Sequence, residues 1–399
     1  MRRIDLPLFF LTSLQLWAQQ DYRVRVSDEA TGEPLSHVIV SSSGGGKIMG
    51  NQNGFFICRA EKKEVIQISC IGYNTLSLRA QDLADSIVLS PLKISDYAVS
   101  AQHVINRVST RADKDYWKYG DDCRSFLYQM LLRHGEWVEL NEACIEACPS
   151  VNLRELRLYG GRRLRNESPT KDYPSVGALN LHQLIVGGPI TYESTFWQSI
   201  RKPFTIHKAK DNRYKRYSEA RSLRTAAFDD VWYDAEVRTL IDSNGHKIYR
   251  LTFIPEPEYP GPILEGTMYV DGKTFRMLAF EGTLHNFSLE LEVDRKLWSG
   301  QVDPTIRITY MQERGYTEIE SVVANFKIGH VTCHSTLLNL RNRKISFDSP
   351  FAFNPRIKDD IVAAINKMGT IKSDFWDNEI IQHTEEEEKL IRGMVDYNK

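Results

Sequence analysis

The sequence lacks a surplus of charge of either sign, and beyond its first residues it lacks any long apolar run. Its 399 residues hold 51 Lys and Arg against 52 Asp and Glu, which is a net charge of −1. A protein that binds nucleic acid through its phosphates carries a basic excess, so the composition excludes that class as the default. After residue 18 no stretch reaches the length of about 18 apolar residues that a membrane-spanning helix needs.

Cysteine is scarce, and the six residues are too scattered for a disulfide scaffold. Cys58 and Cys70 lie in neighbouring predicted strands and form one candidate pair. Cys144 and Cys148 are four residues apart, which in a strand separates them by about 13 Å, too far for a bridge unless the chain bends. Free buried thiols are therefore the general expectation.

The familiar catalytic signatures are absent too. There is no Gly-x-Ser-x-Gly elbow, no P-loop and no His-Glu-x-x-His helix. The glycines at 44–46 are not followed by the Lys-Ser/Thr pair and the helix of a phosphate site, so they indicate a loop. The sequence accordingly predicts no cofactor.

The first residues resemble a secretory signal peptide. Two arginines follow Met1, a mostly apolar run extends from Leu6 to Leu16, and Ala18 ends the segment. The run is too short to span a bilayer. We expect residues 1–18 to be removed and the chain to be exported; the alternative is a buried N-terminal strand or helix.

Residues 20–91 show short alternating segments separated by turn residues. The predicted strands are Tyr22–Val26, His37–Ser41, Phe55–Cys58, Val65–Ser69 and Ser86–Leu89. Spacings of this kind indicate an antiparallel β-sandwich. Gly32 and Gly54 are expected to adopt backbone conformations that other residues resist.

Three motifs in this region resemble the carboxypeptidase regulatory-like domain. They are Thr31-Gly-Glu-Pro-Leu35, Gly50-Asn-Gln-Asn-Gly-Phe-Phe56 and Ser69-Cys-Ile-Gly-Tyr73. The resemblance implies a transthyretin-like sandwich of the kind found in Gram-negative cell envelopes, where it precedes another domain. Asn51 and Asn53 stand where that family commonly has acids, which argues against a calcium site in this turn.

The resemblance does not extend to a zinc carboxypeptidase. Its metal pair, His-x-x-Glu, occurs here only at His383–Glu386, and no further histidine follows. We interpret that segment as a solvated helical face, and we expect no metal site.

Residues 97–399 read as one α+β domain with helical segments at its two ends. Apolar residues at helical spacing predict a helix over 97–111. Hairpins then follow over 123–148 (hinged at His134-Gly135), 233–254, 266–280 (with a tight turn at Asp271-Gly272) and 288–338. Consecutive hairpins favour a curved antiparallel sheet or partial barrel. The predicted fold is therefore mainly β: a sandwich followed by an α+β domain.

The helix-then-hairpins order, with Gly266–Thr274 in its middle, resembles periplasmic half-barrels of the lipoprotein-sorting type. That resemblance implies a concave face that cradles acyl chains. Over most of its length the chain also resembles uncharacterised envelope proteins ending, as here, in Phe375-Trp376 and a Thr384-Glu-Glu-Glu-Glu tail. The implied location is the periplasm or the periplasmic face of the outer membrane.

Two clusters are candidates for chemistry. His330-Val-Thr-Cys-His334 has three potential metal ligands, but in a strand the cysteine points away from both histidines, so ordinary sheet residues are the preferred interpretation. Glu139, Glu142 and Glu146 could supply a carboxylate pair, although glutamates of half-exposed strands are usually solvated.

The segment 151–224 is strongly basic and rich in aromatic residues. It could recognise anionic headgroups, phosphates or acidic glycans. The alternative is a charged excursion whose arginines are neutralised by acids elsewhere, such as those of the tail at 374–399. The candidate anionic-ligand patch consists of Arg154, Arg157, Arg162, Arg163, Arg165, Arg201, Lys202, Arg213, Lys215 and Arg216.

These observations favour a non-enzymatic envelope protein that binds or carries a lipid, a glycan or a protein partner. Two alternatives remain open. The chain could be an accessory subunit that docks on an outer-membrane receptor or secretion machine through its sandwich, or a hydrolase with an unrecognised site. Ligand, partner and oligomeric state are not determined by the sequence.

Overall fold

The computed structural model describes most of the chain outside its N-terminus and several connecting segments. The described residues are 19–116, 123–147, 156–166, 233–255, 263–285, 287–293, 296–313, 316–328, 330–340, 351–353, 365 and 380–396. The predicted signal peptide, most of the basic segment and Cys148 lie outside them. Among the described helices, none has the length and apolar character needed to cross a membrane.

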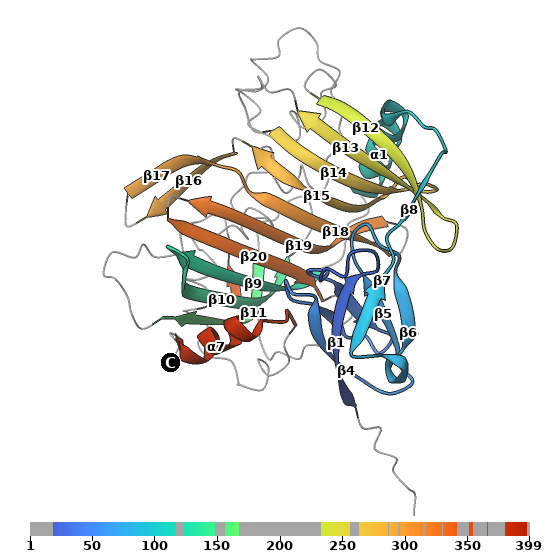
Figure 1. Cartoon of the computed structure of the whole chain (residues 1–399). Helices are drawn as coiled ribbons and strands as arrows, with labels where there is room; N and C mark the ends of the chain where they lie inside the picture. Colours follow the sequence, from blue (N-terminus) through green and yellow to red (C-terminus); the bar gives the residue numbers. More distant parts are fainter. Residues whose placement is uncertain are drawn as a thin grey trace, which may run out of the picture.

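Two small sheets form the N-terminal part of the chain (Figure 1). Their side chains meet in one apolar core that includes Val24, Phe56, Ile66, Ile68 and Leu89. One sheet has the order β4-β1-β7 and the other β3-β2-β5-β6. Their strands are β1 (Gln20–Asp28), β2 (Ile39–Ser42), β3 (Lys47–Met49), β4 (Phe55–Ala60), β5 (Val65–Ser69), β6 (Leu76–Arg79) and β7 (Ser86–Leu89). The expected sandwich is thus present, but the β1–β7 pair is parallel, which the prediction of a purely antiparallel arrangement missed.

Two turns of the sandwich depend on glycine, as predicted, but to different degrees. Gly32 and Gly54 have φ values of 73° and 71°, in the region that residues with a Cβ rarely adopt. A Cβ at Gly54 would lie 2.4 Å from the carbonyl oxygen of Val26, whereas a Cβ at Gly32 would meet nothing within 4 Å.

We therefore expect Gly54→Ala to lower the free energy of unfolding by about 2 kcal/mol more than Gly32→Ala, since only the former adds a backbone clash to the backbone strain. Urea unfolding of both variants measures the difference. Equal losses would show that the 2.4 Å approach is relieved at little cost.

A single large antiparallel sheet of 13 strands dominates the rest of the fold (Figure 1). Its main path is β21-β11-β10-β9-β20-β19-β18-β15-β14-β13-β12-β8, and β22 pairs with β11. The strands are β8 (Lys93–Ser95), β9 (Cys123–Arg133), β10 (Glu136–Ala147), β11 (Leu156–Arg165), β12 (Tyr233–Ile241), β13 (Lys247–Pro255), β14 (Ile263–Asp271), β15 (Met277–His285), β18 (Thr305–Glu313), β19 (Tyr316–Ile328), β20 (Val331–Asn339), β21 (Phe351–Phe353) and β22 (Val395–Asp396). The strands β16 (Phe287–Val293) and β17 (Lys296–Val302) form a separate hairpin.

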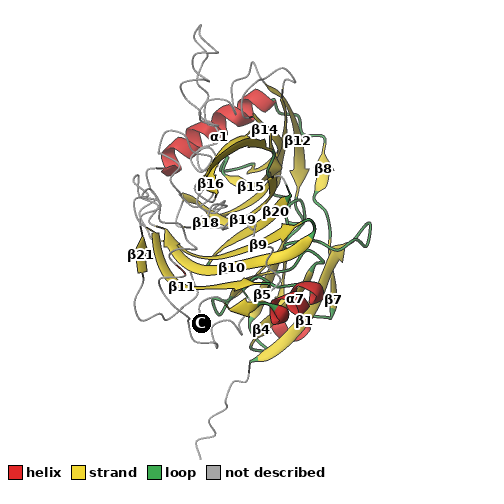
Figure 2. Cartoon of the chain, turned by 90° about the vertical axis from the view of Figure 1, so that its left-hand side faces the viewer, coloured by secondary structure: helices red, strands yellow, loops and turns green. Residues whose placement is uncertain are grey.

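The large sheet is strongly curved, and its two faces carry different neighbours (Figure 2). The helix α1 (Ala101–Tyr116) lies on the concave side, where its Val104, Ile105 and Val108 are buried. His103 and Arg107 of this helix contact the ring of Phe275, which in turn contacts Tyr249 of β13. The sandwich and the C-terminal helix α7 (Glu385–Gly393) lie on the convex side.

A C-terminal segment, residues 380–384, joins the sandwich to the convex face of the sheet; we call it the strap. Ile381 forms a parallel bridge with Met49, whose amide donates to Ile380 and whose carbonyl accepts from Gln382. Residues 380–384 are all buried. The Thr384 side chain then caps α7 in a reciprocal capping box with Glu387. The predicted C-terminal helical segment is thus present, but His383 just before it is buried rather than solvated.

The fold class predicted from the sequence is confirmed: the protein is mainly β, with a large curved antiparallel sheet and two described α-helices. The prediction of a tight turn at Asp271-Gly272 was wrong. Asp271 accepts hydrogen bonds from the backbone amides of Lys273 and Thr274, and Phe275 adopts the positive φ of 58°. An aspartate-capped, longer loop therefore replaces the two-residue turn. The domain boundary between residues 91 and 97 stays a prediction.

Candidate ligand-binding face

The concave face of the large sheet carries a continuous apolar row. Because neighbouring strands pair in register, the members of the row lie side by side from β10 to β13. Every one of them is buried. The row consists of Ala143, Leu127, Leu337, Val322, Ile308, Phe280, Met268 and Leu251. The face is thus apolar across eight strands, which gives it the surface chemistry of a hydrocarbon group.

The adjacent row of the same face changes character along its length. At the β11 end it is polar, and from β19 to β13 it is apolar or lacks side chains. In order it consists of Arg163, Asn141, Gln129, Ser335, Ala324, Ile306, Gly282, Gly266 and Phe253. The concave face is therefore amphipathic along the direction that crosses the strands.

A buried ion-pair cluster anchors the polar end of that row. The Arg163 guanidinium donates from Nε and Nη2 to the two Glu139 oxygens, each at 3.0 Å. Arg165 Nε lies 3.4 Å from Glu139 Oε2, and Asn141 Nδ2 donates to Glu139 Oε1 at 3.0 Å. The Glu139 side chain has no exposed surface. A buried carboxylate is tolerated here because several donors satisfy both of its oxygens.

Some hydrogen-bond acceptors in the same row lack a donor among the described residues. No described residue donates to Asn141 Oδ1 or engages Ser335 Oγ, although both atoms are buried. Asn141 lies in β10 and Ser335 in β20, with β9 between them, so their backbones are about 10 Å apart across the sheet. An unsatisfied buried polar atom carries a free-energy cost of about 1–3 kcal/mol. A molecule with hydroxyl or amide donors could remove that cost at both positions.

The structure separates the members of the predicted anionic-ligand patch. Arg163 and Arg165 belong to the concave cluster, whereas Arg162 projects from the opposite face of β11 and pairs with Glu142. The Arg157 side chain lies outside the described residues, as do the remaining six members, Arg154, Arg201, Lys202, Arg213, Lys215 and Arg216. Recognition of anions by that segment stays a proposal. Its described arginines are paired with the acids of β10.

The expectation that Glu139 and Glu142 are solvated was wrong, because both are buried. They also lie on opposite faces of β10: Glu139 contacts Arg163 on the concave side, while Glu142 contacts Arg162 and lies 3.8 Å from His383 Nε2 on the convex side. Two carboxylates on opposite faces of a sheet cannot act on one substrate bond. The Glu146 side chain lies outside the described residues.

The convex pair belongs to a second buried polar group under α7. The ring of Tyr128 packs against His383 with centroids 5.1 Å apart. Burial, together with the negative charges of Glu387 and Glu142, raises the pKa of Tyr128 well above its ordinary value. The phenol is therefore neutral at any physiological pH, and the group fastens the strap to the sheet.

The histidines and cysteines behave as ordinary sheet residues where the structure describes them. His334 Nδ1 lies 2.6 Å from Asn325 Oδ1 on the convex face, while Cys333 is buried in the concave face. Burial raises the pKa of the Cys333 thiol. Cys58 and Cys70 are free, so the candidate disulfide is not formed. Within the described residues, no three His, Cys, Asp or Glu side chains gather around a common point.

Sequence reasoning overlooked the polar end of the concave face, although a signal was present. In β9 the inward positions alternate as Leu127, Gln129 and Leu131, and only the middle one is polar. A single polar residue at an inward position of an apolar strand marks a place where the core must satisfy a hydrogen bond. Asn141 and Ser335 carry the same signal in their own strands.

Comparisons with known proteins add little. No family model matches the chain, and no curated protein matches it. Among solved structures it is similar to a LolA superfamily protein from Nitrosomonas europaea (11% identity, 62% of this chain and 96% of that one, TM-score 0.21). It is also similar to a DUF1329 family protein from Desulfovibrio piger (10%, 63% and 94%, 0.24) and to a putative outer membrane lipoprotein-sorting protein domain from Vibrio parahaemolyticus (12%, 63% and 94%, 0.25). Likeness at this level leaves the function to be inferred from the site itself.

Proposed function

We propose that this chain is a non-enzymatic, exported envelope protein that holds an amphiphilic lipid on the concave face of its large sheet. The observation that carries the proposal is the amphipathic row, polar at Asn141 and Ser335 and apolar from Ala324 to Phe253. A hydrocarbon chain would lie across β19 to β13, and its head would lie at β9 to β11.

The polar atoms indicate the type of head. Asn141 Oδ1 and Ser335 Oγ can accept hydrogen bonds, so the fitting head carries hydroxyl donors, as glycerol or a sugar does. The Glu139 carboxylate already accepts from Arg163 and forms an ion pair with Arg165. The unsatisfied atoms of this end are acceptors, so a neutral hydroxylated head, which supplies donors, is favoured over a phosphate, whose oxygens mainly accept.

Entry of such a lipid requires movement, because the side chains of both rows are covered. Among the described elements, α1 lies over the concave face (Figure 2). It is held by the apolar residues Val104, Ile105 and Val108 on one side of the helix. Apolar contacts are non-directional, so a hydrocarbon chain can replace them without leaving polar groups unsatisfied.

Ser335→Ala tests the proposal at the polar end. We expect its affinity for monopalmitoylglycerol to fall about tenfold while its affinity for methyl palmitate, which lacks the hydroxyls, is unchanged, because one hydrogen bond to the head is lost. Native mass spectrometry and fluorescence titration with the two lipids measure this preference.

Ser321→Ala is the matched control, since Ser321 is equally buried but lies on the opposite face, where its hydroxyl bonds Thr309. It should retain the wild-type preference for the glycerol ester. Absence of lipid binding by the wild-type protein, or the same loss of preference in both variants, would contradict the proposal.

A further inference from the structure

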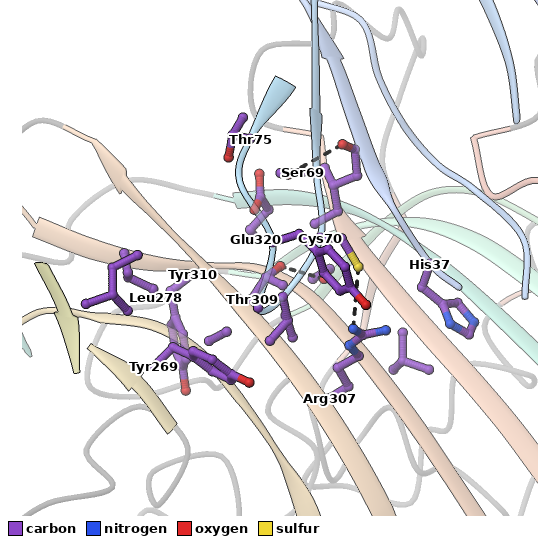
Figure 3. A pocket seen from close by; sticks show the side chains of 18 of the residues that line it. His37, Ser69, Cys70, Thr75, Tyr269, Leu278, Arg307, Thr309, Tyr310 and Glu320 are labelled. Atoms are coloured by element: carbon purple, nitrogen blue, oxygen red, sulfur yellow. Dashed lines mark hydrogen bonds between the residues drawn. The ribbon is translucent and has the colours of Figure 1, made fainter. Parts of the chain in front are cut away.

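A separate pocket lies between the sandwich and the convex face of the large sheet, on the other side of the sheet from the proposed lipid face. It has a volume of about 200 Å³. The sandwich contributes His37, Ile39, residues 69–73 and Thr75, and strands β13, β14, β15, β18 and β19 contribute the other wall. Figure 3 shows Arg307 and Tyr269 reaching into it from the sheet, with Cys70 and His37 opposite.

Arg307 is the main cation of this pocket. Its Nη1 donates to the Ser36 carbonyl at 3.1 Å, and its Nη2 donates to Cys70 Sγ at 3.7 Å. Its Nε lies 3.9 Å from Glu281 Oε2, which is too long for a hydrogen bond. Sulfur is a weak acceptor, so the hydrogen bond from Arg307 to Cys70 is weak.

The other titratable groups of the lining leave that positive charge largely uncompensated. Burial raises the pKa of the Cys70 thiol, so it stays neutral. Burial and the charge of Arg307 lower the pKa of His37 to about 4, so the imidazole is neutral near pH 7. Glu320 is bound to Lys47 at 2.9 Å. Outside the lining, Glu281 forms an ion pair with Arg307 at 3.9 Å, and because 41% of the Glu281 side chain is exposed, solvent weakens this pair.

The remaining walls are mostly apolar and aromatic. Ile71 and Leu92 come from the sandwich side and face Ile248, Tyr269 and Leu278 of the sheet side. The volume is below the range of about 300–1,000 Å³ typical of sites for drug-sized ligands. The occupant must therefore be small, with an apolar body and a group that a single guanidinium can pair.

We propose that this junction pocket is a second binding site, which takes a small organic carboxylate with its aromatic or aliphatic body between the sandwich and the sheet. A carboxylate suits one arginine, since the planar guanidinium pairs with it through two parallel hydrogen bonds. A phosphate ester carries more charge and would call for a second free cation, whereas Lys47 is already engaged by Glu320.

The test compares acids with their uncharged amides. Benzoate and hexanoate are titrated against benzamide and hexanamide by calorimetry on the wild-type protein and on Arg307→Gln. We expect each acid to bind about tenfold or more tightly than its amide to the wild type, and this preference to shrink to about twofold in Arg307→Gln, since a hydrogen bond to a charged group is lost.

Arg238→Gln is the matched control, because Arg238 is an exposed arginine of β12, outside the pocket lining. It should keep the full wild-type preference for acids over amides.

Ala279→Leu provides a second test, which is needed because Arg307 also binds the Ser36 carbonyl. This variant fills the pocket while keeping Arg307, and it should weaken the binding of both acids and amides about tenfold. Thermal unfolding of each variant verifies that it is folded.

Alkylation of Cys70 locates the bound acid independently. Saturating benzoate should slow the modification of Cys70 by iodoacetamide in the wild type, measured by peptide mass mapping, and should leave its rate unchanged in Arg307→Gln. Equal binding of acids and amides to the wild type, or unchanged Cys70 reactivity under saturating benzoate, would overturn the proposal. Neither result depends on whether the concave face binds a lipid.

Discussion

Glu139→Leu should lower the free energy of unfolding by about 3–5 kcal/mol, the largest effect that we expect from one substitution in this protein. The Glu139 carboxylate is fully buried and accepts both of the 3.0 Å hydrogen bonds from Arg163. Removing it leaves a guanidinium buried without its carboxylate, and that situation is far more costly than the loss of an exposed ion pair. Equilibrium unfolding in urea measures the change.

Asp21→Asn provides the comparison for an exposed pair. Asp21 binds Arg59 at 2.8 Å in the sandwich, and about half of each side chain is exposed. Its loss should cost at most about 1 kcal/mol. Addition of Arg163→Met to Glu139→Leu should restore more than half of the lost stability, since it removes the buried charge. A cost for Glu139→Leu no larger than that for Asp21→Asn would refute the assignment of a buried pair.

This buried pair also explains why β11 was not predicted. Its residues, Leu156–Arg165, carry several arginines and were interpreted as part of a charged excursion. Arg162 and Arg163 point to opposite faces of the strand, and each finds a glutamate on the neighbouring β10. Cross-strand neutralisation depends on register between segments about twenty residues apart, and a pattern of residue types along one strand does not contain it.

The alternation of apolar and polar residues predicted strands well where one face of the strand packs on an apolar core. The bounds of β5 and β7 match the predicted segments Val65–Ser69 and Ser86–Leu89, because alternation is set by the core that each strand faces. The helix α1 and both strands of the hairpin at His134-Gly135 were found for the same reason. The short strands β3, β6 and β8 were missed. β3 and β8 have only three residues each, and β6, unlike the equally short β7, has no buried residue to mark an inward face.

The candidate sites depended on long-range contacts, and these were the hardest to foresee. The junction pocket joins Cys70 to Arg307, which are 237 residues apart in the sequence. The strap joins Met49 to Ile381. The basic segment was interpreted either as an anion-binding patch or as an excursion neutralised by acids elsewhere, such as those of the tail. Its described arginines pair with glutamates of β10, and the tail contributes β22, which pairs with β11.

The junction should also make the fold sensitive to mild acid through His37. In an unfolded chain a histidine binds a proton near pH 6.5, whereas burial and Arg307 lower the pKa of the folded His37 to about 4. Between these two values the unfolded chain binds more protons, so stability falls as the pH falls. We expect His37 to contribute a loss of up to about 3 kcal/mol between pH 7 and pH 4, complete once the pH is below its folded pKa.

His37→Asn isolates this contribution. His37 has a φ of 55°, and asparagine tolerates this left-handed conformation better than most residues. Urea unfolding at several pH values should therefore give a variant whose stability changes less with pH than that of the wild type. Burial also lowers the pKa of His334, but this residue is present in both proteins, so its contribution to the pH dependence cancels in the comparison. If His37→Asn instead parallels the wild type down to pH 4, the imidazole takes its proton without opening the junction, and the sandwich and the sheet are less tightly coupled than their contacts imply.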